Sequence, residues 1–406
     1  MRQIYLAAVL LFSISSCSDM LESGSSRIVF EDEYRLDDPY NPFYAISGIL
    51  SQLQAIGDRY VLLGELRGDL MQTTAVAPVS LQEINTFQVK ADNEYARKSD
   101  YYAIINNCNY VLHRLDTSLV VGNEKLILRD YAEVKTIRAW TYFQLGLIFG
   151  EVAYITEPEI DLDAAQAQYP AIRLNDLVDT LIEDLKPYAS LPPISASRTP
   201  DPFLSANLLL GDLYLYRNDY QEAAARYYSE IIHSRIVLSG NYINRWTNST
   251  FESISLSHFS SYTGESLAQI RYSSDPKEYH SLLTRYSFYK EPFIVPAKNY
   301  VDFMNASGYF YSDNYNSPIT GFREGDTRGQ VVTKASRSGN AFLLLDAKSS
   351  SLPEGELYVI YKYCASSSNS NGDLLPEELL TDEGTPVYPA SLSIYRNPHL
   401  YLRFAE

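Results

Sequence analysis

LLLGDLYLYRNDYQEAAARYY, residues 208–228, is the stretch that decides the fold of this chain. Gly211 and Tyr214 precede a polar turn, and Ala223 and Tyr227 follow it at helical spacing. Small residues at Gly211 and Ala223 let two helices cross closely, while the two tyrosines fill the wider gaps beside the crossing. The stretch therefore predicts a helical hairpin.

These offsets match the tetratricopeptide pattern, in which Leu-Gly, an aromatic residue, alanine and a second aromatic residue stand at fixed positions. We expect the hairpin to begin at Asp201-Pro202, because Asp is a good N-cap and Pro fits the first turn. The segment RAWTYFQL, from Arg138 to Leu145, looks like a degenerate copy. Because one hairpin cannot bury its apolar face alone, stacked neighbours are expected.

Helical periodicity dominates residues 41–235. Apolar residues recur every three to four positions in residues 102–112 and 131–145. Another apolar stripe, in residues 174–185, is ended by Pro187. The chain is therefore predicted to be mainly α, with a tetratricopeptide-like helical scaffold.

Three positions in this helical region have specific interpretations. Trp140 lies on a packed helix and is predicted to be structural, and Cys108 is predicted to be a small core residue. Gly150 is a natural stop for its helix, and the following residues favour a short extended segment. A Cys108–Cys364 disulfide is possible in an oxidising envelope, but the spacing does not require it.

The character of the sequence changes in residues 236–398. Helical periodicity weakens, while Ser, Asn, Gly and aromatic residues become more frequent. Short strands are expected at Glu356 to Tyr363, within long loops laid over the helical frame. Residues 399–406 begin a helical pattern that stops without a cap, which we interpret as a truncated C-terminal helix. Residues 41–406 are predicted to form a single domain.

The N-terminus has the layout of a bacterial lipoprotein signal. One basic residue, Arg2, precedes an apolar run from Ile4 to Ile14, and Ser15-Ser16-Cys17 follows. The run is too short to span a bilayer, so residues 1–16 are predicted to be a cleaved signal and Cys17 a lipidated residue. An ordinary secretion signal with an incidental cysteine is the alternative. Residues 17–40 are predicted to be an acidic stem.

Composition narrows the possible partners. The formal net charge is −17, so the chain repels phosphate backbones and nucleic acid is a poor candidate partner. The same charge argues against a polybasic membrane contact, which leaves the lipid as the only membrane anchor. The chain contains 35 tyrosines, whose flat apolar faces and polar tips favour recognition of sugars or extended peptides. Packing between helices is the alternative for any single tyrosine.

The sequence offers no catalytic or metal-binding motif. It contains no Walker loop, no His-Glu-x-x-His and no Cys-x-x-Cys, and its five histidines show no close ligand spacing. Gly264-Glu265-Ser266-Leu267-Ala268 resembles a nucleophile elbow only in part, because its last glycine is alanine. The acidic pairs at residues 377–378 and 382–383 lie in a polar loop and are read as solvated charge. We therefore predict a protein that is not an enzyme and that has no cofactor, and the sequence names no metal ligands, although a bound calcium ion is left open.

Ligand-binding residues are expected where aromatic side chains gather in polar stretches of the sequence. They are also expected where polar side chains nearer the N-terminus can orient a ligand. The candidates for ligand binding are Arg67, Asp69, Trp246, Tyr286, Tyr289, Tyr309, Tyr311 and Tyr315.

Several motifs, in this order, resemble the SusD/RagB family of Bacteroidetes outer-membrane lipoproteins. The motifs are Cys17-Ser18-Asp19, residues 102–109 (YAIINNCN), residues 138–154, the hairpin at 202–233, residues 293–303 (FIVPAKNYVDF), Asp326-Thr327-Arg328, Tyr361-Lys362-Tyr363 and the final residues 401–406 (YLRFAE).

The resemblance implies a predominantly helical protein that captures oligosaccharide or peptide nutrients at the cell surface. It also implies lipid anchoring in the outer membrane and delivery of the ligand to a partner, a SusC-like TonB-dependent barrel. Many glycan-binding members carry a Trp shortly before the first of the helical motifs, where this chain has Arg97-Lys98-Ser99-Asp100. That difference favours a peptide ligand modestly. A surface hydrolase and a repeat-type assembly scaffold are the alternatives from other classes.

Overall fold

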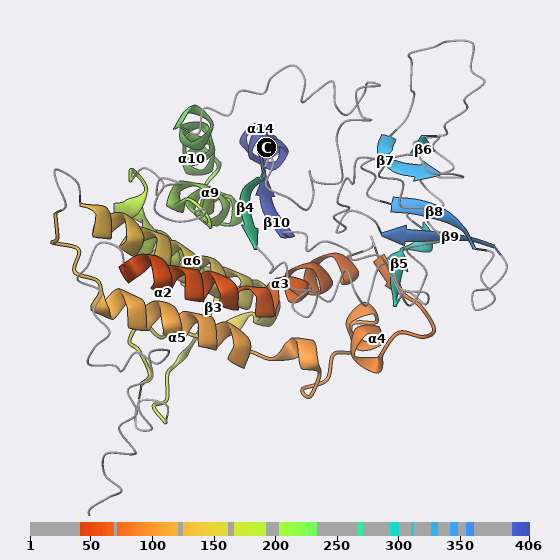
Figure 1. The fold of residues 1–406 in the computed structure, drawn as a ribbon, viewed down its shortest axis with the longest axis horizontal. Helices are drawn as coiled ribbons and strands as arrows, with labels where there is room; N and C mark the ends of the chain where they lie inside the picture. Colours follow the sequence, from red (N-terminus) through yellow and green to blue (C-terminus); the bar gives the residue numbers. More distant parts are fainter. Residues whose placement is uncertain are drawn as a thin grey trace, which may run out of the picture.

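The computed structural model describes residues 41–68, 71–120, 125–160, 166–191, 203–233, 266–270, 293–299, 310–311, 326–331, 342–347, 355–360 and 392–406. Helices form the larger part of this structure, and a four-stranded sheet lies at the opposite end from α10 (Figure 1).

The helices follow the predicted scaffold closely. The α-helices are α2 (Asn41–Gln52), α3 (Gln54–Val61), α4 (Val79–Asn85), α5 (Ser99–Arg114), α6 (Leu126–Phe149), α8 (Leu174–Leu185), α9 (Ala206–Tyr216), α10 (Tyr220–His233) and α14 (Asn397–Ala405). Short π and 3-10 turns accompany them at η1 (Leu62–Leu66), η2 (Glu94–Ala96) and η3 (Lys186–Tyr188).

The hairpin of α9 and α10 forms as the sequence predicts. Gly211 and Ala223 are buried, as are Tyr214 and Tyr227. A methyl group added at Gly211 would lie only 2.5 Å from Cε1 of Tyr227, so the aromatic ring lies directly against the glycine backbone. The glycine is therefore required by the close approach of the two helices.

Helices α6 and α8 cross in the same manner. A methyl group at Gly146 would lie 2.7 Å from Cδ1 of Leu174 and 2.9 Å from Cδ2 of Leu177. Gly146 in α6 thus allows a close helix crossing, as Gly211 does in α9. This shared geometry explains why the segment from Arg138 to Leu145 resembles the hairpin sequence.

The start of α9 differs from the prediction. The helix begins at Ala206 and not at Asp201-Pro202, and Ser205 is its N-cap. The Ser205 hydroxyl accepts a hydrogen bond from the Leu208 N–H at 3.1 Å. A Ser side chain bonds an unpaired N–H of the first turn as well as an Asp side chain does. The cap predicted at Asp201, four residues upstream, was therefore wrong.

The expected stops are present. Helix α6 ends at Phe149, and Gly150 follows with φ of +77°, a conformation that glycine adopts without strain. The chain then runs extended through β2 (Glu151–Ala153), which pairs antiparallel with β3 (Ala171–Arg173). The apolar stripe of α8 ends at Leu185, before Pro187.

Among the residues described after α10, strands predominate until the final helix α14. The remaining strands are β1 (Met71–Thr73), β4 (Ser266–Ile270), β5 (Ile294–Pro296), β6 (Phe310–Tyr311), β7 (Asp326–Val331), β8 (Phe342–Ala347), β9 (Gly355–Ile360) and β10 (Leu392–Arg396). Strand β9 confirms the strand expected at Glu356 to Tyr363, although it ends at Ile360.

Within the described part of the chain, the strands form one four-stranded sheet and three pairs. The order in the sheet is β6-β7-β8-β9, with the first two pairings parallel and the last antiparallel. Two of the pairs join distant parts of the chain: β1 pairs antiparallel with β5, and β10 pairs antiparallel with β4. The first of these pairings ties the helical N-terminal half to residues that follow much later in the sequence.

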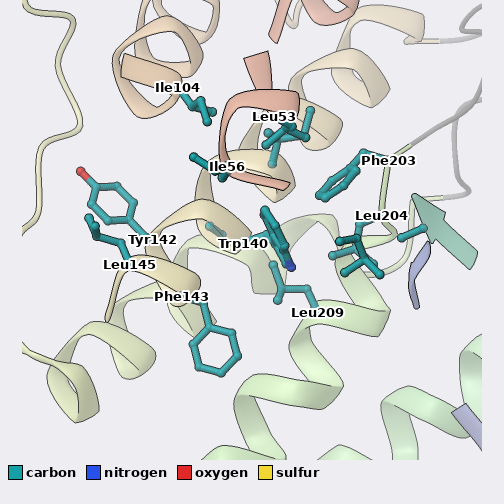
Figure 2. Close-up of a cluster of buried hydrophobic side chains, with 14 of the residues drawn as sticks. Leu53, Ile56, Ile104, Trp140, Tyr142, Phe143, Leu145, Phe203, Leu204 and Leu209 are labelled. Atoms are coloured by element: carbon teal, nitrogen blue, oxygen red, sulfur yellow. The ribbon is translucent and has the colours of Figure 1, made fainter. Parts of the chain in front are cut away.

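One hydrophobic cluster runs from Ile46 in α2 to Leu400 in α14. Trp140 is fully buried within it, which confirms its structural role. Its ring meets Phe203 edge-on at 5.1 Å between centroids, with Leu204 and Leu209 close by (Figure 2). The core therefore joins α6 to the start of the α9/α10 hairpin.

A buried carboxylate fixes that junction. Glu133 in α6 is 6% exposed, and its Oε1 accepts a hydrogen bond from the Phe203 N–H at 2.6 Å. Burial raises the pKa of Glu133 to about 7, against the lowering effect of the Phe203 and Leu204 N–H groups, and the nearby Asp130 charge raises it further.

The Gly211→Ala substitution should destabilise the fold. The added methyl group must displace the Tyr227 ring from a packed core, which we expect to lower the free energy of unfolding by about 1–3 kcal/mol. Urea unfolding measures this change. Gly48→Ala in α2 is the matched control, because nothing lies within 4 Å of a methyl group there. An equal effect of the two substitutions would contradict the close crossing.

The Glu133→Gln substitution should change how stability depends on pH. Because the pKa of Glu133 is raised in the folded protein, its contribution to stability is fully present below about pH 4.5 and is lost as the pH rises through about 7. As the pH rises from 5 to 8, the free energy of unfolding of the variant should therefore increase relative to that of the wild type by up to about 3 kcal/mol. Urea titrations at both pH values test this, with the exposed Glu183→Gln as control for the loss of one charge. Parallel pH profiles of wild type and Glu133→Gln would refute it.

Candidate functional site

Most of the predicted ligand-binding residues lie outside the described residues. These are Asp69, Trp246, Tyr286, Tyr289, Tyr309 and Tyr315, and the predicted lipidation residue Cys17 lies outside them as well. Tyr311 is in the short strand β6. Arg67 is half-buried directly after η1, and it lines a cavity. Their roles in binding stay predictions, and the cavity beside Arg67 is the candidate site that the structure provides.

The cavity has a volume of about 490 Å³, which lies within the usual range for small-ligand sites. Its walls come from α3 and η1, the C-terminal part of α6, the end of α9, strand β10 and α14. Segments separated by more than three hundred residues therefore meet around it. Figure 1 shows β10 and α14 beside α9, with α3 close to β10.

Aromatic side chains make much of the cavity wall. Tyr60, Phe143, Tyr216 and Tyr395 all line it. Phe143 meets Tyr216 edge-on, with 5.8 Å between ring centroids, and the Tyr216 side of this pair is the more exposed, at 38%. The wall thus presents a partly exposed ring that a second ring holds in place.

A buried carboxylate, Asp212 in α9, organises the polar side of the cavity. Its Oδ1 accepts a hydrogen bond from the Tyr227 hydroxyl at 2.6 Å, and its Oδ2 accepts one from the Tyr395 hydroxyl. The Arg403 guanidinium lies 3.2 Å from Oδ1. Asp212 therefore joins α9, α10, β10 and α14 in one network.

Burial shapes the protonation of this network. Burial raises the pKa of Asp212, while Arg403 and the two tyrosine hydroxyls lower it. Burial and the Asp212 charge together raise the pKa of Tyr60 to about 12. Burial and the same charge also raise the pKa of Tyr227 and that of Tyr395. The tyrosines around Asp212 are therefore neutral at physiological pH, and Tyr227 and Tyr395 serve as hydrogen-bond donors.

Arg59 lines the cavity, but its guanidinium bonds to residues outside the cavity. It forms an ion pair with Asp100, and it donates to the backbone carbonyl of Arg97 at 3.1 Å and to that of Glu94 at 3.4 Å. These bonds fix the start of α5. Arg59 is therefore structural.

The helical motif YAIINNCN, residues 102–109, is also structural. Tyr102 exchanges two hydrogen bonds with the backbone of Ala153, and Asn106 does the same with Glu159. Asn109 donates to the carbonyls of Ile155 and Glu157. The motif therefore holds the extended segment after β2 on the surface of α5.

Residues of the second motif complete this arrangement. Tyr142 both donates to the carbonyl of Ile155 at 2.9 Å and accepts from its N–H at 2.8 Å. Arg138 donates to Asn109 Oδ1 at 2.8 Å and pairs with Asp184 at 2.9 Å. Because these polar groups bond to the backbone and to one another, they stabilise the scaffold.

Cys108 is a buried free thiol, which confirms its place in the core. Burial raises the pKa of the thiol to about 12, against the lowering effect of Arg138. A buried thiol that stays protonated is unreactive.

Within the described part of the chain, no group of three or more His, Cys, Asp and Glu side chains gathers that could bind a metal ion. Ser266, the centre of the partial nucleophile elbow, is the first residue of strand β4. Among the same residues, no helix combines the length and the apolar character needed to cross a membrane.

Sequence reasoning missed Tyr60, Tyr395 and Arg403. A signal for them existed in Asp212, an acidic residue inside the otherwise apolar run from Leu208 to Tyr214. A carboxylate at a buried helical position needs donors from elsewhere in the fold. The sequence did not show which residues would supply them.

Solved structures of other proteins share this architecture. No family model matches the chain. A SusD homologue from Bacteroides thetaiotaomicron superposes with a TM-score of 0.63 at 14% identity, covering 93% of this chain and 75% of that one. A laminarin-binding SusD-like protein superposes with a TM-score of 0.56 at 16% identity, covering 89% of this chain and 79% of that one.

The chain has the SusD fold. A curated relative, SusD-like protein P2 of Formosa agariphila, is 28% identical over 225 residues, which make up 53% of this chain and 43% of that protein. The chain thus matches less than half the length of this relative. Together these similarities confirm the resemblance to the SusD/RagB family and the mainly α, tetratricopeptide-like architecture of a SusD fold.

The Tyr395→Phe substitution should loosen the wall of the cavity in this SusD fold. It removes a donor from the buried Asp212 carboxylate, which we expect to lower the free energy of unfolding by about 1–3 kcal/mol. Hydrogen exchange should show a larger loss of protection in α14 than in α5. The exposed Tyr44→Phe in α2 is the matched control. Unchanged protection of α14 would contradict the role given to Asp212.

Proposed function

We propose that the protein is a cell-surface lipoprotein that captures a nutrient, an oligosaccharide in the first instance, and delivers it to a TonB-dependent barrel in the outer membrane. The observation that carries the proposal is the SusD fold, which extends over 93% of the chain in one superposition. One structural neighbour is a laminarin-binding SusD-like protein, which supports a glycan as the ligand.

The proposed attachment to the membrane is through acyl chains on Cys17. The layout of residues 1–17 supports it, because a basic start, an apolar run and two small residues precede the cysteine. Several acyl chains on one residue give stable anchoring. The acidic stem that follows, residues 17–40, would separate the SusD fold from the membrane surface.

The proposed capture involves binding without covalent chemistry. The buried carboxylates Asp212 and Glu133 are each engaged by donors of the fold, whereas glycoside hydrolysis requires two carboxyl groups that face the substrate across a cleft. Aromatic rings in the later part of the chain would supply affinity, and polar side chains near them would fix the orientation of the ligand. A peptide as ligand is the alternative that the same experiment decides.

The proposal is tested by affinity capture of the tagged lipoprotein from its native envelope, followed by mass spectrometry of what is retained. We expect a TonB-dependent barrel and an oligosaccharide. The Cys17→Ala variant should leave the membrane fraction. Recovery of a peptide would change the ligand class, and recovery of the protein with neither barrel nor ligand would overturn the proposal.

The contribution of the loop-rich region is tested by Tyr309→Ala. Loss of one stacking ring should weaken binding of the recovered saccharide roughly three- to tenfold in calorimetry. Tyr44→Ala, which removes an exposed tyrosine from α2, is the matched control. Equal affinities of the two variants would remove Tyr309 from the site.

A further inference from the structure

The cavity beside Arg67 combines two kinds of wall that a sugar ring uses. Part of the wall is aromatic and aliphatic, with Phe143, Tyr216, Leu215 and Leu147. Another part is polar, with Arg67, Arg403, Asp212 and Glu65. A sugar ring has an apolar face of C–H groups and an edge of hydroxyls, so it can use both kinds of wall at once.

Tyr216 is the ring best placed for stacking. It is the last residue of α9, its side chain is 38% exposed, and Phe143 supports it edge-on at 5.8 Å. A ring held by another ring loses little freedom when a ligand packs on it. Leu147 in α6, which is 45% exposed, extends the apolar surface of the cavity.

Arg67 is the polar group best placed for a ligand. Its backbone N–H is bonded to the Gly64 carbonyl, which fixes the residue at the end of η1. Within the described part of the chain, its guanidinium has no ion-pair partner, although the residue is half-buried. A half-buried guanidinium presents five N–H donors, which suits a set of neighbouring hydroxyl groups.

Arg403 adds directed donors to the polar part of the wall. Its guanidinium lies 3.2 Å from Asp212, and its side chain remains 41% exposed. Because Tyr227 and Tyr395 hold the Asp212 carboxylate, the direction of the Arg403 guanidinium is fixed as well. One carboxylate does not use all five donors of a guanidinium.

The charges in and around the cavity cancel. The lining carries three arginines, Arg59, Arg67 and Arg403, and two carboxylates, Glu65 and Asp212. The charge of Arg59 is neutralised by Asp100, which lies outside the lining, and Arg403 is paired with Asp212. An anionic ligand would meet the Glu65 and Asp212 carboxylates, and a cationic one would meet the arginines. The lining therefore suits an uncharged ligand with many hydroxyl groups.

We propose that this cavity is a saccharide subsite for one or two uncharged sugar rings, built on the helical scaffold and separate from the aromatic residues of the loop-rich region. Tyr216 would stack on the ring face, and Arg67 and Arg403 would donate to its hydroxyls. The proposal rests on the proposed function, since it names the class of sugar and a second place where it binds.

The test uses the full-length lipoprotein in detergent and the neutral disaccharide laminaribiose, titrated by calorimetry. Tyr216→Ala and Arg67→Gln should each weaken binding about tenfold or more. Tyr220→Ala is the control for Tyr216, because Tyr220 is exposed and lies outside the cavity. Arg217→Gln is the control for arginine, because Arg217 pairs with Asp179 on the surface. Both controls should bind within about twofold of the wild type.

The outcomes separate the two proposals. Wild-type affinity in Tyr216→Ala and Arg67→Gln, with loss in Tyr309→Ala, would overturn the subsite and leave the proposed function standing. Tighter binding of a glucuronate-bearing disaccharide than of laminaribiose would overturn the uncharged class. Absence of saccharide binding by the wild type, with a peptide bound instead, would overturn both the glycan proposal and the subsite. Thermal unfolding of each variant confirms that the loss is not a loss of fold.

Discussion

The close crossing of α9 and α10 at Gly211 is the constraint on which the rest of the structure depends. Because Gly211 has no side chain, the Tyr227 ring lies against the helix backbone, and its hydroxyl reaches Asp212. The same carboxylate receives Tyr395 from β10 and Arg403 from α14. One small residue thus sets the position of a hairpin, and the hairpin in turn holds the C-terminal strand and helix.

A second crossing repeats this arrangement with a different outcome. Gly146 lets α6 approach α8, and Asp184 of α8 then pairs with Lys135 and Arg138 of α6 at 2.5 Å and 2.9 Å. Arg138 also donates a hydrogen bond to Asn109, which links α6 to α5. In both crossings, a glycine allows close backbones, and a carboxylate on one of the helices then binds partners from other elements. The first crossing borders the cavity, whereas the second holds the segment after β2.

The two helical motifs, at residues 102–109 and 138–154, which carry part of the family resemblance, serve the scaffold. Tyr102, Asn106, Asn109 and Tyr142 bond the backbone of residues 153–159, and Trp140 fills the core. Ligand recognition is expected elsewhere, in residues that can vary without cost to these contacts. This division explains how a fold can be recognised at 14% identity while its ligand stays open to experiment.

The sequence by itself determined the helical scaffold, because periodicity and small residues at crossings are local properties of the chain. Gly211, Ala223, Trp140, Cys108 and Gly150 could all be placed from it, whereas the cap at Ser205 could not, since Asp201 offered an equal local signal. Of the candidate site, the sequence proposed only Arg67, and the tertiary structure decided the rest. Arg67, Tyr216 and Arg403 meet only because distant elements pack together, and the pairing of a buried carboxylate with its donors is set by that packing.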